Sequence, residues 1–309
     1  RAPSRSVPPG PRRRADPGTG RGPRGDEGRV EPILTAPVES AYLSLAVTRG
    51  RLQGISGILC DIDGVLWDSQ DRKRPTPGAH EAIRCIKEER RLPVRFVTNT
   101  TTRSRDTLYR EIRQRGYPIE RDEIVAPTTL GAEWLRRKGR PSVFLVMRED
   151  TQEEFAEFPR DDVRPDYIVI GNNRDRWDYA LVNRIFLMLV NGSEMLALHK
   201  QRYWQSGDDI AVDIGCFVTG LEYSSGKRAT AIGKPEPLFF QAALEAIGVA
   251  PAEAIMVGDD IETDIGGAQR AGLRGVLVRT GKFREYLVRQ STVAPDLVIA
   301  SLGDLPSHL

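Results

Sequence analysis

Short apolar runs alternate with longer amphipathic stretches from about residue 52 onward. The runs have the length of strands, and the longer stretches carry apolar residues at helical spacing, as Ala79, Ile83 and Ile86 do. This alternation predicts parallel βαβ units in an α/β fold, with helices on both faces of the sheet. The expected strands are 55–60, 93–97, 142–147, 166–171, 194–199, 254–258, 275–279 and 296–300, and the expected helices are 77–91, 104–116, 179–190, 237–247 and 263–271.

The same pattern divides the chain into three parts. Residues 1–50 are an expected disordered extension, because the Arg-, Pro- and Gly-rich stretch up to about residue 30 has almost no large apolar side chain to bury. Residues 51–126 and 227–309 are expected to form one α/β core. Residues 127–226 have strands of their own and are expected to form an inserted α/β domain.

Composition narrows the classes of partner. The chain has 45 Lys and Arg against 43 Asp and Glu in 309 residues, a net charge of +2. So balanced a charge argues against a nucleic acid or an anionic membrane as partner. No apolar run approaches the roughly 18 to 20 residues that span a bilayer. Cys60, Cys85 and Cys216 form no CxxC pair, which favours reduced, buried thiols and a cytoplasmic protein. The eight arginines and three acids of residues 1–30 leave an organellar transit peptide open, although the prolines there favour an untargeted leader.

Two polar clusters follow the first two expected strands. Asp61-Ile62-Asp63-Gly64 comes directly after strand 55–60, and such a turn is by itself more often solvated than functional. Thr98-Asn99 follows strand 93–97, where a hydroxyl and backbone N–H groups could hold a phosphoryl oxygen, although turn chemistry is the commoner explanation.

Two more clusters lie near the end of the chain. Lys234 stands between Gly233 and Pro235 before a helix, where it could neutralise phosphate charge or simply be solvated. Strand 254–258 ends in four acids within six residues: Asp259, Asp260, Glu262 and Asp264. Acids near a helix start gain a little from the helix dipole, but so dense a cluster favours a hard cation such as Mg²⁺. Because the carboxyl ends of parallel strands share one edge of a sheet, these clusters are expected to converge.

Taken in this order, the four clusters resemble the four motifs of the haloacid dehalogenase superfamily phosphatases, over about residues 52–309. The insert of about 100 residues between the second and third motifs is similar to the large α/β C2 cap of subclass IIA. The resemblance implies a Rossmann-like core, a phosphate-bond hydrolase with Mg²⁺ as cofactor, a small phosphorylated substrate and a homodimer. Six stretches are similar to the branch acting on phospholysine, phosphohistidine and pyrophosphate: 94–101, 199–204, 221–223, 257–260, 266–270 and 278–284.

The resemblance also implies roles for single residues. Asp61 is expected to attack phosphorus and form an aspartyl-phosphate, and Asp63 to act as general acid and then general base. Mg²⁺ is expected to bind the Asp61 carboxylate, the Asp63 backbone carbonyl and Asp259. The expected phosphoryl-binding groups are Thr98, the Asn99 backbone and Lys234, with Asp260 and Asp264 in support.

Substrate choice is expected to depend on Asp63 and on the insert. The branch above is expected to carry serine where this chain has Asp63, a better general acid, so ordinary phosphate monoesters become expected substrates. Lys200 and Arg202, beside the aromatic pair Tyr203-Trp204, are candidate substrate contacts, although they could equally face solvent over buried rings. Two alternatives stay open: a non-catalytic binding or scaffold protein on the same fold, and a phosphotransferase that passes the phosphoryl group to an acceptor other than water.

Overall fold

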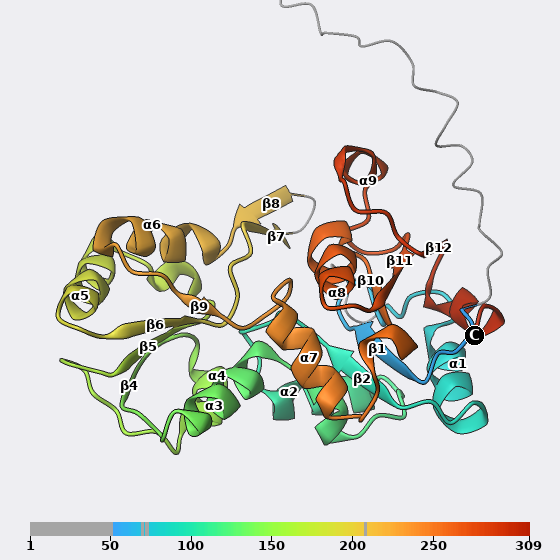
Figure 1. The fold of residues 1–309 in the computed structure, drawn as a ribbon, viewed down its shortest axis with the longest axis horizontal. Coiled ribbons are helices and arrows are strands. Elements are labelled where there is room, and N and C mark those ends of the chain that lie inside the picture. Colours follow the sequence, from blue (N-terminus) through green and yellow to red (C-terminus); the bar gives the residue numbers. More distant parts are fainter. Residues whose placement is uncertain (1–51, 69–70, 72–73, 207–208) are drawn as a thin grey trace, which may run out of the picture. The chain divides into compact units, whose positions relative to one another are not determined.

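The computed structural model describes residues 52–68, 71, 74–206 and 209–309. The extension predicted for residues 1–50 lies outside the described residues. Over the described part, two parallel sheets are each flanked by helices (Figure 1), which confirms the α/β class.

The first sheet has six parallel strands in the order β12-β11-β10-β1-β2-β3. Strands β10 and β1 are neighbours at its centre and are buried over their whole length, as their continuous apolar sequences predict. The six strands are β1 (Gly57–Asp61), β2 (Val94–Val97), β3 (Ile124–Val125), β10 (Ala254–Gly258), β11 (Arg274–Val278) and β12 (Leu297–Ile299).

Alternate residues of β1 serve two hydrophobic clusters on opposite faces of this sheet. Ile58 and Cys60 pack with residues of α1 and α2, whereas Leu59 packs with residues of α7 and α8. The helices and helical turns around this sheet are α1 (Ala79–Arg84), η1 (Cys85–Glu89), α2 (Arg105–Gln114), η2 (Arg121–Glu123), α7 (Pro237–Glu245), η5 (Pro251–Glu253), η6 (Ile261–Gly266), α8 (Gly267–Arg270), α9 (Glu285–Gln290) and η7 (Leu302–Ser307).

Local sequence sets several of these helix ends. Ser104 caps α2 as predicted, since its hydroxyl accepts a hydrogen bond from the Thr107 backbone N–H at 3.2 Å. The helix predicted over 77–91 is α1 continued by η1, a wider helical turn closed by the bond from Arg90 N to Cys85 O. The predicted helix at 263–271 likewise starts two residues earlier, as η6 followed by α8.

The second sheet is parallel, with four strands in the order β4-β5-β6-β9. Helices α5 and α6 pack on one face, and α3 and η3 on the other (Figure 1). Strand β9 lies beyond residue 226, so this sheet extends past the predicted end of the insert. The elements are α3 (Pro127–Arg137), β4 (Val143–Val146), α4 (Glu149–Gln152), η3 (Glu153–Phe155), β5 (Tyr167–Ile170), η4 (Arg174–Arg176), α5 (Tyr179–Val190), β6 (Glu194–Ala197), α6 (Gly215–Ser225) and β9 (Thr230–Ala231).

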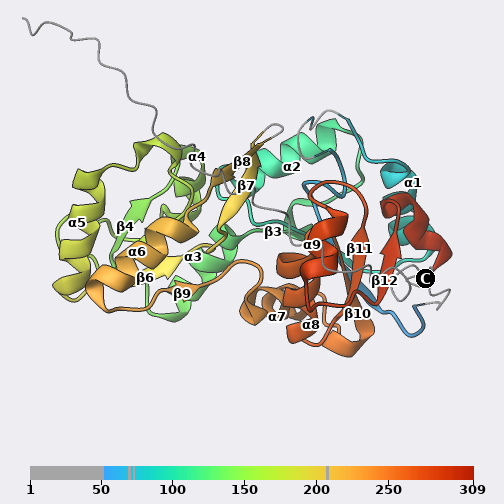
Figure 2. The ribbon, with the colours of Figure 1, turned by 90° about the horizontal axis from the view of Figure 1, so that it is seen from above.

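An antiparallel hairpin that the sequence did not predict lies between β6 and α6 in the chain. It consists of β7 (Tyr203–Ser206) and β8 (Asp209–Val212). In Figures 1 and 2 it lies between α6 and the elements around the six-stranded sheet. Residues 200–204 line one pocket together with Asp259 and Asp260, which follow β10.

Two expectations from composition can be compared with the described residues. The three cysteines are free, but only Cys60 is buried; Cys85 is half-buried and Cys216 is exposed, so the prediction of three buried thiols was wrong. Cys85 lies on η1 and Cys216 on α6, and neither belongs to the hydrophobic clusters that these helices help to form. Among the described residues, no helix combines the length and the apolar character that crossing a bilayer requires.

Candidate active site

Three neighbouring strands bring the first, second and fourth motifs to one edge of the six-stranded sheet. Asp61 is the last residue of β1, Thr98 follows β2, and Asp259 follows β10. The strands are parallel and paired in the order β10-β1-β2, so their carboxyl ends lie side by side. The convergence expected from the sequence is therefore present in the fold.

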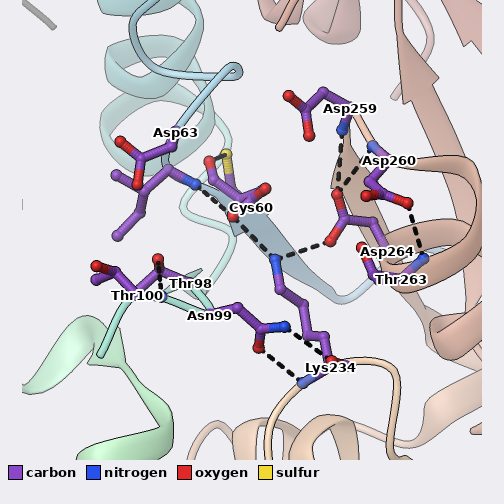
Figure 3. A network of polar contacts seen from close by, with 12 residues as sticks. Cys60, Asp63, Thr98, Asn99, Thr100, Lys234, Asp259, Asp260, Thr263 and Asp264 are labelled. Carbon is purple, nitrogen blue, oxygen red and sulfur yellow. Dashed lines mark hydrogen bonds and ion pairs between the residues drawn. The ribbon is translucent and has the colours of Figure 1, made fainter. Parts of the chain in front are cut away.

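Lys234 enters this edge from the loop between β9 and α7. Its ammonium lies 2.7 Å from Asp264 Oδ1 (Figure 3) and 2.9 Å from Asp61 Oδ1. All three side chains are buried. Burial alone lowers the pKa of Lys234, but the charges of Asp264 and Asp61 outweigh it and raise the pKa above its usual value. The lysine therefore stays charged and holds two carboxylates together.

Asn99 holds the loop that carries Lys234. Its side-chain amide donates to Lys234 O at 2.7 Å and accepts from Lys234 N at 2.8 Å. This pair of bonds spans two segments that are distant in sequence. The Asn99 side chain thus positions the lysine, a role that the sequence did not indicate.

Three buried carboxylates meet beside Lys234. One oxygen each from Asp61, Asp259 and Asp264 lies within 4.8 Å of the others. Burial raises the pKa of Asp61 to about 7, against the opposing charge of Lys234, and burial also raises the pKa of Asp259 well above its usual value. Asp259 Oδ1 is buried and has no hydrogen-bond partner among the described residues. An unpaired buried oxygen beside two further carboxylates fits a hard divalent cation, whose charge would favour the ionised forms.

Two glycines pack directly against Asp259. A Cβ atom on Gly64 would lie 2.0 Å from Asp259 Oδ2, and one on Gly281 would lie 1.9 Å from the same oxygen. Gly64 also has a φ of +89°, in the left-handed region that glycine favours. The glycine of the first motif is therefore required both by the turn and by the position of Asp259.

We expect Gly64→Ala to lower any activity of this site by about 100-fold or more, because the new methyl group must displace the Asp259 carboxylate. Gly139→Ala is a matched control, since Gly139 has the same φ of +89° and nothing within 4 Å of the added Cβ. The control should cost only about 1 kcal/mol of stability from backbone strain. Activity assays and chemical denaturation of both variants test this; equal effects on activity would contradict it.

Asp264 and Asp260 organise the strand end around Asp259. Asp264 Oδ2 accepts the backbone N–H groups of Asp259 and Asp260 at 3.2 and 3.1 Å. Asp260 Oδ1 accepts those of Glu262 and Thr263 and so caps η6. Both acids therefore shape the loop that carries Asp259, and their predicted role in support of the metal and of Lys234 stays a prediction.

Lys282 is a cation of this site that sequence reasoning missed. Its backbone N–H donates to Asp259 Oδ2 at 2.7 Å, and its ammonium lies 3.7 Å from Asp260 Oδ2. It belongs to the loop after β11, which neighbours β10 in the sheet. A lysine after a glycine at the end of a sheet strand was the available signal, but only the strand order places it beside Asp259.

The Asp63 carboxylate lies apart from the three buried ones (Figure 3). Its Oδ1 accepts a hydrogen bond from Trp67 Nε1 at 2.9 Å, and its Oδ2 lies 3.2 Å from Arg103 Nη2. Arg103 is almost fully buried and also contacts Glu111 at 2.7 Å. Arg103 is a second residue that the sequence did not single out, since only the fold brings it to the first motif.

Thr98 is buried at the end of β2, and its hydroxyl oxygen accepts a hydrogen bond from the Thr100 backbone N–H at 3.0 Å. The backbone N–H of Thr98 itself pairs with Val125 O in β3. The first bond uses the hydroxyl as an acceptor and leaves its hydrogen to be donated. Thr98 can therefore donate to an anion bound at the carboxyl edge.

A cavity of about 580 Å³ opens beside the acid cluster. Asp259, Asp260 and Lys282 line it from the first sheet, and Lys200 and Arg202 line it from the second part of the chain. The Lys200 ammonium is engaged by the buried Glu222 at 2.8 Å, whereas the Arg202 guanidinium lies over the Tyr203 ring at 5.9 Å. Both candidate contacts thus reach the cavity wall, although Lys200 is also part of a buried ion pair.

Comparisons with known proteins show which family this chain resembles. A family model described as haloacid dehalogenase-like hydrolase matches residues 58–159, and one described as HAD-hydrolase-like matches residues 231–305. Phospholysine phosphohistidine inorganic pyrophosphate phosphatase of Homo sapiens is 38% identical over 258 residues, which cover 82% of this chain and 94% of that protein. Haloacid dehalogenase-like hydrolase domain-containing protein 2 of Bos taurus is 35% identical over 258 residues, covering 83% and 96%.

The fold is also similar to a solved structure, 4-nitrophenylphosphatase from Thermotoga maritima. The TM-score is 0.76 at 27% sequence identity, and the match covers 83% of this chain and 98% of that one. The relatives and the solved structure are phosphatases or hydrolases by name, and they match this chain over both sheets. The chain therefore belongs to the haloacid dehalogenase superfamily, as one of its subclass IIA phosphatases.

Proposed function

We propose that this phosphatase is Mg²⁺-dependent and hydrolyses small phosphorylated molecules through an aspartyl-phosphate on Asp61. The observation that carries the proposal is the buried group of Asp61, Asp259 and Asp264 with Lys234 at the edge of the sheet. A nucleophilic carboxylate, a fixed cation and a set of oxygen ligands are what phosphoryl transfer through a covalent intermediate requires.

In the first step Asp61 attacks phosphorus. Both side-chain contacts of Asp61 with described residues, from Ile62 N at 2.8 Å and from Lys234 Nζ at 2.9 Å, use Oδ1. Oδ2 is therefore the oxygen offered to the phosphoryl group. The new bond from Oδ2 to phosphorus forms as the bond to the leaving group breaks, while Lys234 and the Thr98 hydroxyl stabilise the phosphoryl oxygens.

Asp63 acts as general acid and then as general base. In the first step it donates a proton to the leaving oxygen, and in the second it accepts one from the water that attacks the aspartyl-phosphate and releases inorganic phosphate. Arg103 Nη2 lies 3.2 Å from Asp63 Oδ2 and holds this carboxylate in place for the second step. For the first step Asp63 has to take up a proton and turn from Arg103 towards the substrate.

The side chains of Asp61 and Asp259 and the backbone carbonyl of Asp63 would hold Mg²⁺, and Asp264 lies close enough to support them. The bound ion supplies charge neutralisation, which lowers the repulsion between the phosphoryl oxygens and the carboxylates. Without it, Lys234 contacts only Asp61 and Asp264 of the three buried acids, an arrangement that burial disfavours.

The substrates are phosphate monoesters, and pyrophosphate and phosphohistidine or phospholysine are further substrates. A protein similar to this chain is named for phospholysine, phosphohistidine and pyrophosphate, and another for 4-nitrophenyl phosphate. Asp63 adds a proton donor for alkoxide leaving groups, which need one more than phosphoramidates do. Arg202 and the Tyr203 ring would contact the leaving group from the cap.

The homodimer expected from the sequence stays a prediction. The cap helices α5 and α6 expose several large apolar side chains that would suit contact with a second copy. These are Tyr179, Leu187, Val190 and Tyr223.

Phosphate release by the full chain tests the proposal, with 4-nitrophenyl phosphate first and then pyridoxal phosphate, nucleotides, sugar phosphates, pyrophosphate and phosphoramidates. We expect EDTA to lower the rate by about 100-fold or more and added Mg²⁺ to restore it. An unchanged rate in EDTA would contradict the metal-dependent mechanism. A measurement of the reaction products separates hydrolysis from phosphotransfer. Hydrolysis gives free inorganic phosphate and no phosphorylated acceptor.

Asp259→Asn should raise the Mg²⁺ concentration needed for half-maximal activity by about 10-fold or more, because a ligand with an unpaired buried oxygen loses its charge.

A further inference from the structure

Lys282 lies on the wall of the 580 Å³ cavity, next to the proposed site of reaction. Asp259 and Asp260 line the same wall, and Arg202 and Tyr203 of the cap line the cavity from another element. A substrate with its phosphoryl group at Asp61 would extend its leaving group into this cavity, whose size suits a small molecule. The mechanism proposed above uses no side-chain contact of Lys282.

The backbone of Lys282 is fixed close to the acid cluster. Its N–H donates to Asp259 Oδ2 at 2.7 Å, and Gly281 before it allows the loop to approach that carboxylate. Thr280 Oγ1 donates to Gly64 O at 2.5 Å and ties the same loop to the first motif. The backbone position from which the Lys282 side chain extends is therefore fixed beside the acid cluster.

The ammonium of Lys282, by contrast, is loosely held. It lies 3.7 Å from Asp260 Oδ2, beyond hydrogen-bond distance, and its side chain is 31% exposed. Lys234 makes two ion pairs of 2.9 and 2.7 Å with 3% exposure, and Lys200 is held by Glu222 at 2.8 Å. Of the two lysines that line the cavity in the described part of the chain, Lys282 is thus the one with capacity for a further acceptor.

We propose that Lys282 binds a second anionic group, carried by the leaving group of the substrate close to the scissile phosphoryl. The inference rests on the proposed function and names its substrate class: phosphate esters whose leaving group also bears a carboxylate. Near Asp259 and Asp260 a second anion would be repelled, unless a cation on the same wall receives it. Lys282 is that cation.

The charge of Lys282 is secure at neutral pH. Its side chain is 31% exposed and its ammonium lies 3.7 Å from Asp260 Oδ2, so it carries the positive charge that is normal for a lysine at this pH. The group therefore meets an incoming anion as a cation. An anion at this place gains a charge-assisted hydrogen bond in a partly buried setting, where such bonds are stronger than in water.

Two substrates with one carbon skeleton test the proposal: 3-phosphoglycerate carries a carboxylate where glycerol 3-phosphate carries a hydroxymethyl group. We expect the wild type to prefer 3-phosphoglycerate, and Lys282→Met to lower the ratio of the two kcat/KM values by about 10-fold or more. Lys282→Arg should keep most of the preference, since it keeps the charge. Lys138→Met, an exposed lysine on the cap, should leave the ratio as it is.

A ratio that does not change in Lys282→Met would overturn the inference, because it would show that Lys282 acts on both substrates alike through the acid cluster. A wild type that favours glycerol 3-phosphate would overturn it too. If Lys282→Met folds poorly, inhibition of the wild type by phosphonoacetate and by ethylphosphonate gives the same comparison, and equal inhibition counts against a second anion site. Failure of the proposed function looks different: the wild type would then release phosphate from none of these esters.

Discussion

Replacing Asp61 by asparagine is expected to reduce phosphate release by about 10³-fold or more at saturating Mg²⁺. The amide cannot attack phosphorus, and it removes one negative charge from the group formed with Asp259 and Asp264. It also breaks the 2.9 Å ion pair with Lys234. Because burial raises the pKa of Asp61 to about 7, the neutral amide should not lower the stability of the fold at neutral pH, and thermal unfolding should show this.

The matched control is Asp178→Asn. Asp178 caps helix α5 in the cap by accepting the Leu181 backbone N–H at 2.7 Å, and asparagine caps a helix equally well. This variant should keep wild-type activity. Trapping of radiolabelled phosphate on the wild-type protein but not on Asp61→Asn would identify the covalent step. Full activity of Asp61→Asn in the presence of Mg²⁺ would refute the nucleophile assignment.

Replacing Lys234 by methionine is expected to cost both activity and stability. Its ammonium is the shared partner of Asp61 and Asp264, and its removal leaves two buried carboxylates facing each other. Losing one partner of a buried ion pair typically costs about 3–5 kcal/mol. Chemical denaturation in EDTA measures this loss, and Mg²⁺ should recover part of it by supplying positive charge to the same carboxylates.

The stability loss should depend on pH with a definite sign. Burial raises the pKa of Asp61 to about 7, and Lys234 opposes that rise, so its removal raises the pKa further. The folded variant then binds a proton that the unfolded chain does not bind until the pH is much lower. The stability gap between Lys234→Met and wild type should therefore shrink as the pH falls from 8 towards 5.

Lys87→Met serves as the control for the Lys234 variant. Lys87 pairs with Glu123 at 2.6 Å and donates to Pro118 O at 2.5 Å, and its side chain is 18% exposed, against 3% for Lys234. Its removal leaves one partly exposed carboxylate instead of two buried ones, so the Lys87 variant should lose less stability than the Lys234 variant and keep its activity. If the two lysine variants proved equally stable, the structural role of Lys234 would be wrong.

Much of the fold was predictable because long apolar runs identify buried parallel strands. The predicted strand 254–258 is β10, and the predicted helix 179–190 is α5, without a shift of either end. The two-residue strands β3 and β9 and the hairpin β7-β8 were not predicted. Such short segments become strands only because a neighbouring strand offers backbone partners, which a local pattern does not reveal.

The sequence by itself determined the class and the family of this protein. Asp61, Thr98, Lys234 and Asp259 stand in a particular order at the ends of apolar strands and before a helix, and that order is readable without coordinates. It identified a haloacid dehalogenase superfamily phosphatase, since each motif is a local feature of a strand end or a helix start.

Only the tertiary structure decided which groups meet. The order β11-β10-β1-β2 places Lys282 beside Asp259, and the loop between β9 and α7 brings Lys234 to Asp61 and Asp264. The fold also brings Arg103 to Asp63, and it lets the Asn99 side chain bind the backbone of Lys234. These contacts join segments far apart in the chain, and their distances depend on strand order and burial rather than on spacing along the sequence.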